Sequence, residues 1–169
     1  YAVVSVMEAL ELRKIIKQKP ILVLGAYNLN YANECAKNDI DLTISSIDEV
    51  KFLNENLESV LKVHLKINTG MNRYGIDTIK DLKKIISEIE KGHKIIVEGV
   101  YTHFATKASD VDFIEKQYKK FEKMIKIVPY SNLIVHCASS YVATTDKLKL
   151  CNMVRIGFSL YGDLYGRLN

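Results

Sequence analysis

The chain has 169 residues, of which 48% are hydrophobic and 26% are charged, and its formal net charge is +4. This length suffices for one hydrophobic core and is short for two. The mild charge excludes a strongly basic nucleic-acid-binding arm or an acidic tail, and no apolar stretch reaches the roughly 18 residues of a membrane span. Three widely spaced cysteines fit neither a disulfide framework nor a paired zinc signature, which favours a reducing compartment.

Strand-like and helix-like segments alternate along the chain. Apolar, β-branched runs predict the strands, and apolar residues at helical spacing predict the helices. In chain order these are a strand at 1–6, a helix that ends before Pro20, a strand at 21–24, a weaker helix at 28–37, a strand at 41–45, a helix at 46–57, a strand at 60–67, a helix at 79–89, a strand at 95–104, a helix at 111–128, and strands at 133–137 and 153–160. Because the sequence begins at Tyr1, already inside the first strand, we expect a piece of a longer protein.

Two helix starts carry a capping-box pattern, Ser5 with Glu8 and Ser46 with Glu49, in which each side chain bonds the other residue's backbone N–H. The strand-helix repeat implies parallel strands joined by right-handed crossovers. Two architectures accept it: an open doubly wound sheet or a closed (β/α)8 barrel. A barrel typically needs about 250 residues, and seven predicted strands are one fewer than closure requires.

Polar side chains gather where several predicted strands end. In both architectures this edge binds ligands. The residues are Lys66, Arg73, His103, Ser139, Ser140 and Arg155. Cationic and hydroxyl groups at this density suit an anionic, phosphate-bearing ligand, and Gly157 would let backbone N–H groups approach a phosphate closely. No P-loop or GxGxxG spacing is present.

Each of these residues also has a structural interpretation. Lys66 could extend to solvent or pair with a carboxylate, Arg73 could form a loop salt bridge, and the two serines could form a turn or a helix cap. His103 is balanced between the two interpretations, whereas His64, His136 and Cys137 are more typical of structural residues. Arg155 is hardest to explain structurally, because an unpaired guanidinium in an apolar strand costs several kcal/mol.

Six segments, in order and spread over nearly the whole chain, resemble the alanine racemase family. They are Ser5 to Arg13 (SVMEALELR), Ile21 to Gly25 (ILVLG), His64 to Gly75 (HLKINTGMNRYG), Gly99 to Ala105 (GVYTHFA), His136 to Ser140 (HCASS) and Asn152 to Gly162 (NMVRIGFSLYG). The resemblance implies that residues 1–169 are a truncated N-terminal (β/α)8 barrel, of the α/β class, that binds pyridoxal 5'-phosphate (PLP).

The resemblance also implies residue roles. Arg155 looks like the arginine that donates a hydrogen bond to the pyridine nitrogen, and His103 like the imidazole stacked against the cofactor ring. Arg73 looks like the residue near the cofactor's phenolic oxygen and the substrate carboxylate, and Lys66 like the lysine that is often carbamylated. The cofactor would further contact Leu24, Ser139, Ser140 and the backbone of Gly157 and Phe158. The family usually has Asn at position 139, so the shorter serine changes that contact.

Two family residues have no counterpart in this chain: the lysine that attaches the cofactor covalently, upstream of Tyr1, and a catalytic tyrosine in a C-terminal β-domain supplied by the partner subunit. The resemblance therefore implies that the intact protein interconverts L- and D-alanine by two-base proton transfer at Cα, and that residues 1–169 alone are inactive. It also implies a cytoplasmic homodimer that supplies D-alanine for peptidoglycan, with a small-molecule substrate and neither a metal, a nucleic-acid partner nor a membrane partner.

Three alternatives remain open. The first is a non-catalytic, PLP-binding barrel protein, which would share the strand-helix repeat and the segment 153–162. The second is a racemase of another amino acid, such as serine, since pocket shape decides the substrate. The third is an unrelated α/β phosphate-binding domain, which would explain the cationic edge without explaining six ordered segments.

Overall fold

The computed structural model describes residues 1–105, 110–140 and 149–161. Its strands are β1 (Ala2–Val3), β2 (Ile21–Val23), β3 (Ile40–Ile44), β4 (Leu61–Lys66), β5 (Ile95–Tyr101) and β6 (Ile134–His136). Its α-helices are α1 (Val6–Ile15), α2 (Ala32–Lys37), α3 (Ile47–Asn56), α4 (Ile79–Ile89) and α5 (Val111–Ile125), and two short 3-10 helices are η1 (Leu29–Tyr31) and η2 (Phe158–Tyr161).

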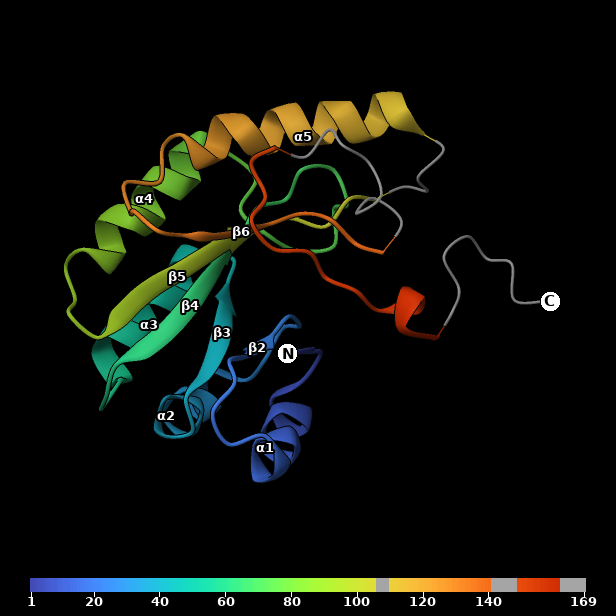
Figure 1. Cartoon of the computed structure of the whole chain (residues 1–169). Helices are drawn as coiled ribbons and strands as arrows, with labels where there is room; N and C mark the ends of the chain where they lie inside the picture. Colours follow the sequence, from blue (N-terminus) through green and yellow to red (C-terminus); the bar gives the residue numbers. More distant parts are fainter. Residues whose placement is uncertain (106–109, 141–148, 162–169) are drawn as a thin grey trace.

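The six strands form one curved sheet in which every neighbouring pair is parallel (Figure 1). Their order in the sheet is their order in the sequence, from β1 to β6. A doubly wound sheet would reverse its strand order at a switch point, so that alternative is excluded. The α-helices lie along the outer side of the sheet. The prediction of a barrel-type α/β architecture is therefore confirmed, as a curled part of a barrel.

Both predicted capping boxes are present. At α1 the Ser5 hydroxyl accepts the Glu8 N–H at 3.2 Å, while the Glu8 carboxylate accepts the N–H of Ser5 at 3.3 Å. At α3 the Ser46 hydroxyl and the Glu49 backbone and side chain repeat the arrangement. Since a cap satisfies N–H groups that a helix start otherwise leaves unpaired, these two helices begin where the sequence predicts.

The predicted strand at 153–160 is wrong. Arg155 forms a single parallel bridge with Ser139, and the backbone then turns into η2. The neighbouring strand β6 is only three residues long, so it offers little backbone for a further strand to pair with. The apolar residues Val154 and Ile156 that suggested a strand are 49% and 43% exposed.

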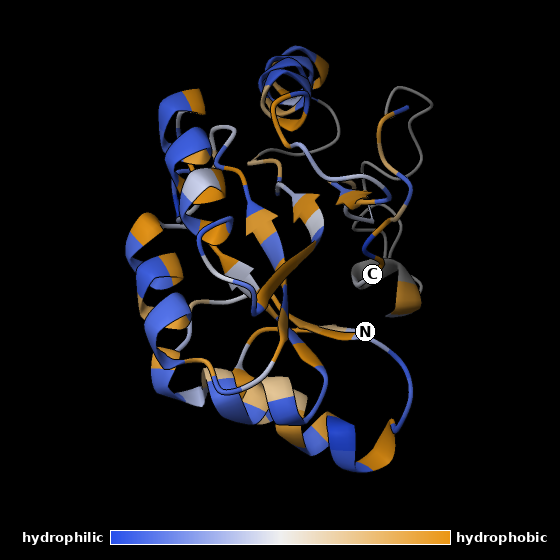
Figure 2. Ribbon diagram, turned by 90° about the vertical axis from the view of Figure 1, so that its left-hand side faces the viewer, coloured by the Kyte–Doolittle hydropathy of each residue, from blue (hydrophilic) through white to orange (hydrophobic). Residues whose placement is uncertain are grey.

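The hydrophobic core lies between the helices and the outer face of the sheet, as the hydrophobic sides of the helices indicate in Figure 2. Side chains such as Leu53, Val63, Leu65, Leu82 and Phe121 are completely buried there. The segment 149–161 lies on the opposite, inner side of the sheet. Within the described ranges, every helix is too short or too polar to span a lipid bilayer.

Candidate active site

Polar side chains occupy the inner face of β3 to β6, because side chains alternate between the two faces of a strand. The strand register places them in two rows across the sheet. The first row runs from Thr43 through His64 and Gly99 to β6, and the second contains Lys66, Tyr101 and His136. All of these side chains are buried. The register therefore assembles a polar inner wall from residues far apart in the sequence.

Gly99 creates the space for one of these residues. A Cβ atom at this position would lie 2.4 Å from His64 Nδ1 and 2.6 Å from the carbonyl oxygen of Ile134. Both distances are far shorter than the contact distance between nonbonded atoms, so any larger residue would clash here. The glycine that seemed to interrupt the predicted strand at 95–104 instead lets the His64 ring lie directly against the β5 backbone.

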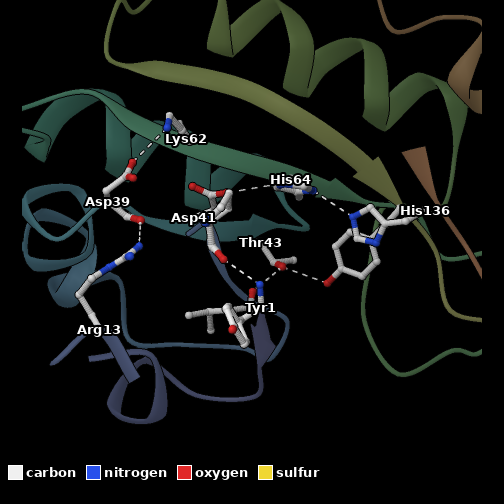
Figure 3. Close-up of polar contacts among 11 residues, drawn as sticks. Tyr1, Arg13, Asp39, Asp41, Thr43, Lys62, His64 and His136 are labelled. Carbon is white, nitrogen blue, oxygen red and sulfur yellow. Dashed lines mark hydrogen bonds and ion pairs between the residues drawn. The ribbon is translucent and has the colours of Figure 1, made fainter. Parts of the chain in front are cut away.

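A chain of four side chains crosses this inner wall, and we call it the buried polar chain; Figure 3 shows the part of it from Asp41 through His64 to His136. The guanidinium of Arg155 lies 2.6 Å from Nδ1 of His136, whose Nε2 lies 3.0 Å from Nδ1 of His64. Nε2 of His64 is 3.7 Å from the carboxylate of Asp41. The chain thus runs from β3 to the segment after β6, with an anion at one end and a cation at the other.

The donor properties of arginine assign the proton positions in the buried polar chain. A guanidinium only donates, so Nδ1 of His136 accepts and its proton is on Nε2. That proton is donated to Nδ1 of His64, whose own proton is then on Nε2 and faces Asp41. Burial first, and then the positive charge of Arg155, hold the pKa of His136 far below its usual value. His136 is therefore a neutral acceptor that orients Arg155.

Arg155 is fixed by backbone contacts as well. It donates to the carbonyl oxygens of His136 at 3.0 Å and Thr102 at 2.7 Å, and its Cζ lies 5.4 Å from the centre of the Tyr101 ring. Among the described residues, these contacts and the one to Nδ1 of His136 use at most three of its five N–H bonds. A rigidly held guanidinium with remaining donors can bind an acceptor atom on a ligand.

Lys66 lies beside Arg155 on the same wall. Its Nζ is 3.2 Å from the centre of the Tyr74 ring and 5.7 Å from that of Tyr101. Burial, followed by repulsion from Arg73 and Arg155, lowers the pKa of Lys66 to about 8. A substantial fraction of this amine is therefore neutral near physiological pH, which makes it a better nucleophile than a surface lysine.

His103 follows β5 and senses the same positive charges. Burial is the main cause that lowers its pKa to about 4, and Arg155, Arg73 and Lys66 add to it. Its imidazole is therefore neutral. In the ranges that the structure describes, none of these three cations forms an ion pair with a carboxylate. Asp41, the carboxylate at the far end of the buried polar chain, faces His64 rather than these cations. The region around Lys66, Arg155 and the exposed Arg73 therefore carries an excess of positive charge, which favours an anionic ligand.

Hydroxyl and amide groups border this positive region. The N–H of Gly157 donates to the Ser140 hydroxyl at 3.0 Å, and Ser139 is bridged to Arg155. A Cβ atom at Gly157 would meet nothing within 4 Å, so its backbone is approachable. Phe158 opens η2 directly after it. Directly after β2, the carbonyl oxygen of Leu24 accepts a hydrogen bond from the Tyr101 hydroxyl at 3.3 Å.

Several members of the wall were not expected from the sequence. Tyr74 and Tyr101 contact Lys66, Thr102 holds Arg155, and Asp41 ends the buried polar chain. A usable signal was the alternation within residues 41–45, where Asp41 and Thr43 interrupt an otherwise apolar strand. The sequence analysis interpreted His136 as a structural residue, and it is buried. Its imidazole also contacts Arg155, the residue for which a structural role was hardest to argue.

Known proteins are similar to this chain in sequence and in fold. Residues 1–165 match the family described as "Alanine racemase, N-terminal domain". The alanine racemase of Staphylococcus carnosus is 36% identical over 166 residues, which cover 96% of this chain and 43% of that protein. The solved structure of the Bacillus anthracis alanine racemase with bound L-Ala-P is 34% identical with a TM-score of 0.88, over 95% of this chain and 43% of that one.

A solved relative with a different name has the same fold. The histidine racemase of Leuconostoc mesenteroides is 30% identical with a TM-score of 0.86, over 95% of this chain and 45% of that one. The chain thus spans less than half the length of these relatives. Since nearly all of its residues match one family, and the inner wall is built from the segments that carry the match, the chain belongs to the alanine racemase family, in its N-terminal domain.

Proposed function

We propose that this chain is the PLP-binding barrel of an enzyme that interconverts L- and D-alanine. The observation that carries the proposal is the buried polar chain, which ends on Arg155 in the same positive region as Lys66 and Arg73, neither of which forms an ion pair among the described residues. This arrangement fixes one guanidinium as a hydrogen-bond donor in positively charged surroundings. A heterocycle that carries a phosphate group would be bound by both features. The proposed activity, substrate and partners are those of the whole protein. The relatives of this chain are more than twice its length.

The chemistry of the donor set fits PLP. The remaining N–H bonds of Arg155 suit the pyridine nitrogen, which is an acceptor when unprotonated. The Ser140 hydroxyl, which accepts the Gly157 N–H, and the backbone around Gly157 and Phe158 would border the phosphate group, with Ser139 next to them. His103 would lie against the ring, and Leu24 would line its pocket.

When bound, PLP makes the Cα–H of an attached amino acid acidic by withdrawing electrons. Arg155 stays protonated at every physiological pH, so it donates to the ring nitrogen and does not protonate it. This limits electron withdrawal, which favours rapid return of the proton over longer-lived side reactions. The neutral imidazole of His103 can stack without adding charge to the ring.

Lys66 and Arg73 would serve the substrate side of the pocket. The lowered pKa of Lys66 leaves part of its amine neutral, as attack on carbon dioxide requires. The carbamate so formed carries a negative charge and would hold Arg73 in place to bind the substrate carboxylate. A charge reversal here would also relieve the repulsion among the three cations.

Proton removal and return need two bases, which we place outside residues 1–169: a lysine that also binds the cofactor and a tyrosine supplied by the second subunit of a cytoplasmic homodimer. We therefore expect residues 1–169 alone to be inactive with PLP and alanine. Turnover by this fragment above the rate of free PLP would contradict that expectation. D-alanine supply for peptidoglycan is the corresponding biological role.

The test uses the full-length protein with PLP and either enantiomer of alanine, followed by chiral chromatography. We expect interconversion in both directions, and we expect Arg155→Ala to lower it at least about 100-fold, the scale on which lost electrostatic contacts act. Lys83→Ala, an exposed charge on α4, is the matched control and should be unchanged. PLP binding without any racemisation would favour a non-catalytic barrel protein.

The relationship to the histidine racemase supports one second candidate, a different amino-acid substrate. Parallel assays with histidine and serine distinguish it from the first. We expect kcat/KM for alanine to exceed both, and a reversed order would assign the chain to another racemase of this fold.

A further inference from the structure

Two of the three cysteines meet beside the inner wall. Cys137 follows β6 directly, and Cys151 lies four residues before Arg155. Their Sγ atoms are 2.7 Å apart. Since a disulfide bond measures about 2.05 Å, the two sulfurs need to approach by only about 0.7 Å to bond. The fold therefore brings together two thiols that are fourteen positions apart in the sequence.

The two thiols differ in reactivity. Cys137 is 1% exposed, whereas Cys151 is partly exposed. The hydrogen bond from Cys137 is the main cause that lowers the pKa of Cys151, and the backbone N–H groups of Cys137 and Ala138 and the charge of Arg155 act in the same direction. The same contact, with burial, raises the pKa of Cys137. Cys151 is thus both the more exposed thiol of the pair and the one that loses its proton more readily, an arrangement typical of a reactive cysteine with a resolving partner.

We propose that Cys137 and Cys151 form an oxidant-sensitive thiol pair that closes to an intrachain disulfide with hydroperoxides. The Cys151 thiolate attacks one peroxide oxygen and breaks the O–O bond, which with one proton gives a sulfenic acid and, from hydrogen peroxide, one water. The Cys137 sulfur then attacks the sulfenic sulfur, forms the S–S bond and releases a second water. The pair loses two electrons and the peroxide gains them.

This disulfide would join two segments that both belong to the candidate active site. Cys137 directly follows His136, and Arg155 donates its backbone N–H to Ala138 at 3.0 Å. A covalent link would fix the end of β6 to the segment that carries Arg155. In a reducing environment the two cysteines would therefore remain free thiols. In an oxidising environment they would form a disulfide that cross-links the two segments of the site.

Cys35 provides an internal control. It is completely buried on α2, and burial raises its pKa to about 12. Its thiol is therefore protonated and inaccessible, and it should not react while the protein is folded. One chain thus contains both the proposed reactive pair and a structural cysteine for comparison.

The test treats the reduced, full-length protein with hydrogen peroxide, blocks the remaining thiols with an alkylating reagent after denaturation, and maps the peptides by mass spectrometry. We expect a linked peptide pair containing Cys137 and Cys151, reversed by a thiol reductant, and alkylation of Cys35. The Cys35→Ser variant should form the same link. In Cys137→Ser, Cys151 should be trapped as a sulfenic acid by a dimedone-type probe.

Folding of each variant is checked by circular dichroism, and the wild-type experiment needs no variant at all. The proposal is overturned if the wild-type protein keeps Cys137 and Cys151 as separate thiols at peroxide levels that modify surface methionines. It is equally overturned if the link forms between other cysteines or between two chains.

Discussion

The outer and inner faces of the sheet contribute differently, although the same strands build them. In β4, Leu61, Val63 and Leu65 are at most 1% exposed and pack toward the helices, whereas His64 and Lys66, on the inner face, are 2% and 4% exposed. Burial of the apolar side chains stabilises the fold by about 25 cal/mol per Å². Burial of the imidazole and the ammonium opposes folding unless each finds a partner.

Because side chains alternate along each strand, the apolar residues that stabilise the fold lie on the outer face and the polar residues of the candidate site lie on the inner face. Mutations on the outer face should change the free energy of unfolding without changing ligand binding. Mutations on the inner face should change charge, protonation and ligand binding in addition to any effect on stability, and a loss of ligand binding caused by a conservative outer-face mutation would show that the separation is wrong.

The largest effect is expected on the outer face. Leu65→Ala removes a completely buried side chain from β4 and leaves a cavity beneath the helices. We expect a loss of about 3 kcal/mol in the free energy of unfolding, measured by urea denaturation. A loss below about 1 kcal/mol would mean that the core relaxes around the site.

The next effect concerns the fit between strands on the inner face. Gly99→Ala places a methyl group against His64 and the backbone of Ile134, and we expect a loss of about 2 kcal/mol from overpacking. Gly157→Ala is the matched control, because its methyl group enters open space. Its stability should stay within about 0.5 kcal/mol of wild type. Equal losses for both variants would refute the steric argument.

The buried neutral histidines predict how stability depends on pH. The pKa values of His103 and His136 are lowered in the folded state, so the unfolded chain binds protons first as the pH falls below about 6.5. Stability is therefore complete above that pH and declines below it, by up to about 1.4 kcal/mol per pH unit for each group.

This decline is measured as urea midpoints between pH 7.5 and 4.5. His136→Gln should flatten the slope, while His93→Gln, on an exposed surface position, should leave it unchanged. An unchanged slope in His136→Gln would show that this imidazole does not contribute to the pH dependence.

The smallest effect has the opposite sign. Lys66→Met removes a buried cation whose pKa is lowered to about 8, while the lost contact with Tyr74 partly offsets the gain. We expect a stabilisation of about 1 kcal/mol together with weaker PLP binding. The gain should be complete below pH 8 and vanish toward pH 10.5, where the lysine of the unfolded chain also loses its proton. Destabilisation at neutral pH would show that the cation is well solvated or paired.

Local signals in the sequence predicted much of the fold. The capping boxes at Ser5 and Ser46 and the five helices depend on neighbouring residues, so the chain itself displays them. The spacing of these elements predicted parallel strands but fitted both a doubly wound sheet and a barrel, and only the resemblance to the alanine racemase family favoured the barrel. The strand predicted at 153–160 was wrong, because strand formation needs a partner strand that sequence spacing does not reveal.

The candidate site was predictable only in part. Lys66 and Arg155 stood out as charges within apolar segments, and the structure places both on one wall. The contact between Arg155 and His136, and that between Cys137 and Cys151, depend on strand register and on the path of the segment after β6. These are properties of the tertiary fold, so a pattern of single residues does not contain them.

The order of the strands has a consequence for how the chain is made. Each strand from β2 to β6 pairs with the strand synthesised just before it. Paired residues lie between 19 positions apart, as in Ile21 with Ile40, and 35 apart, as in Tyr101 with His136. Translation adds roughly 5–20 residues per second, so each strand meets a finished neighbour within seconds of leaving the ribosome. The sheet can therefore grow from its N-terminal edge during synthesis, and the buried polar chain is completed last, when Arg155 emerges.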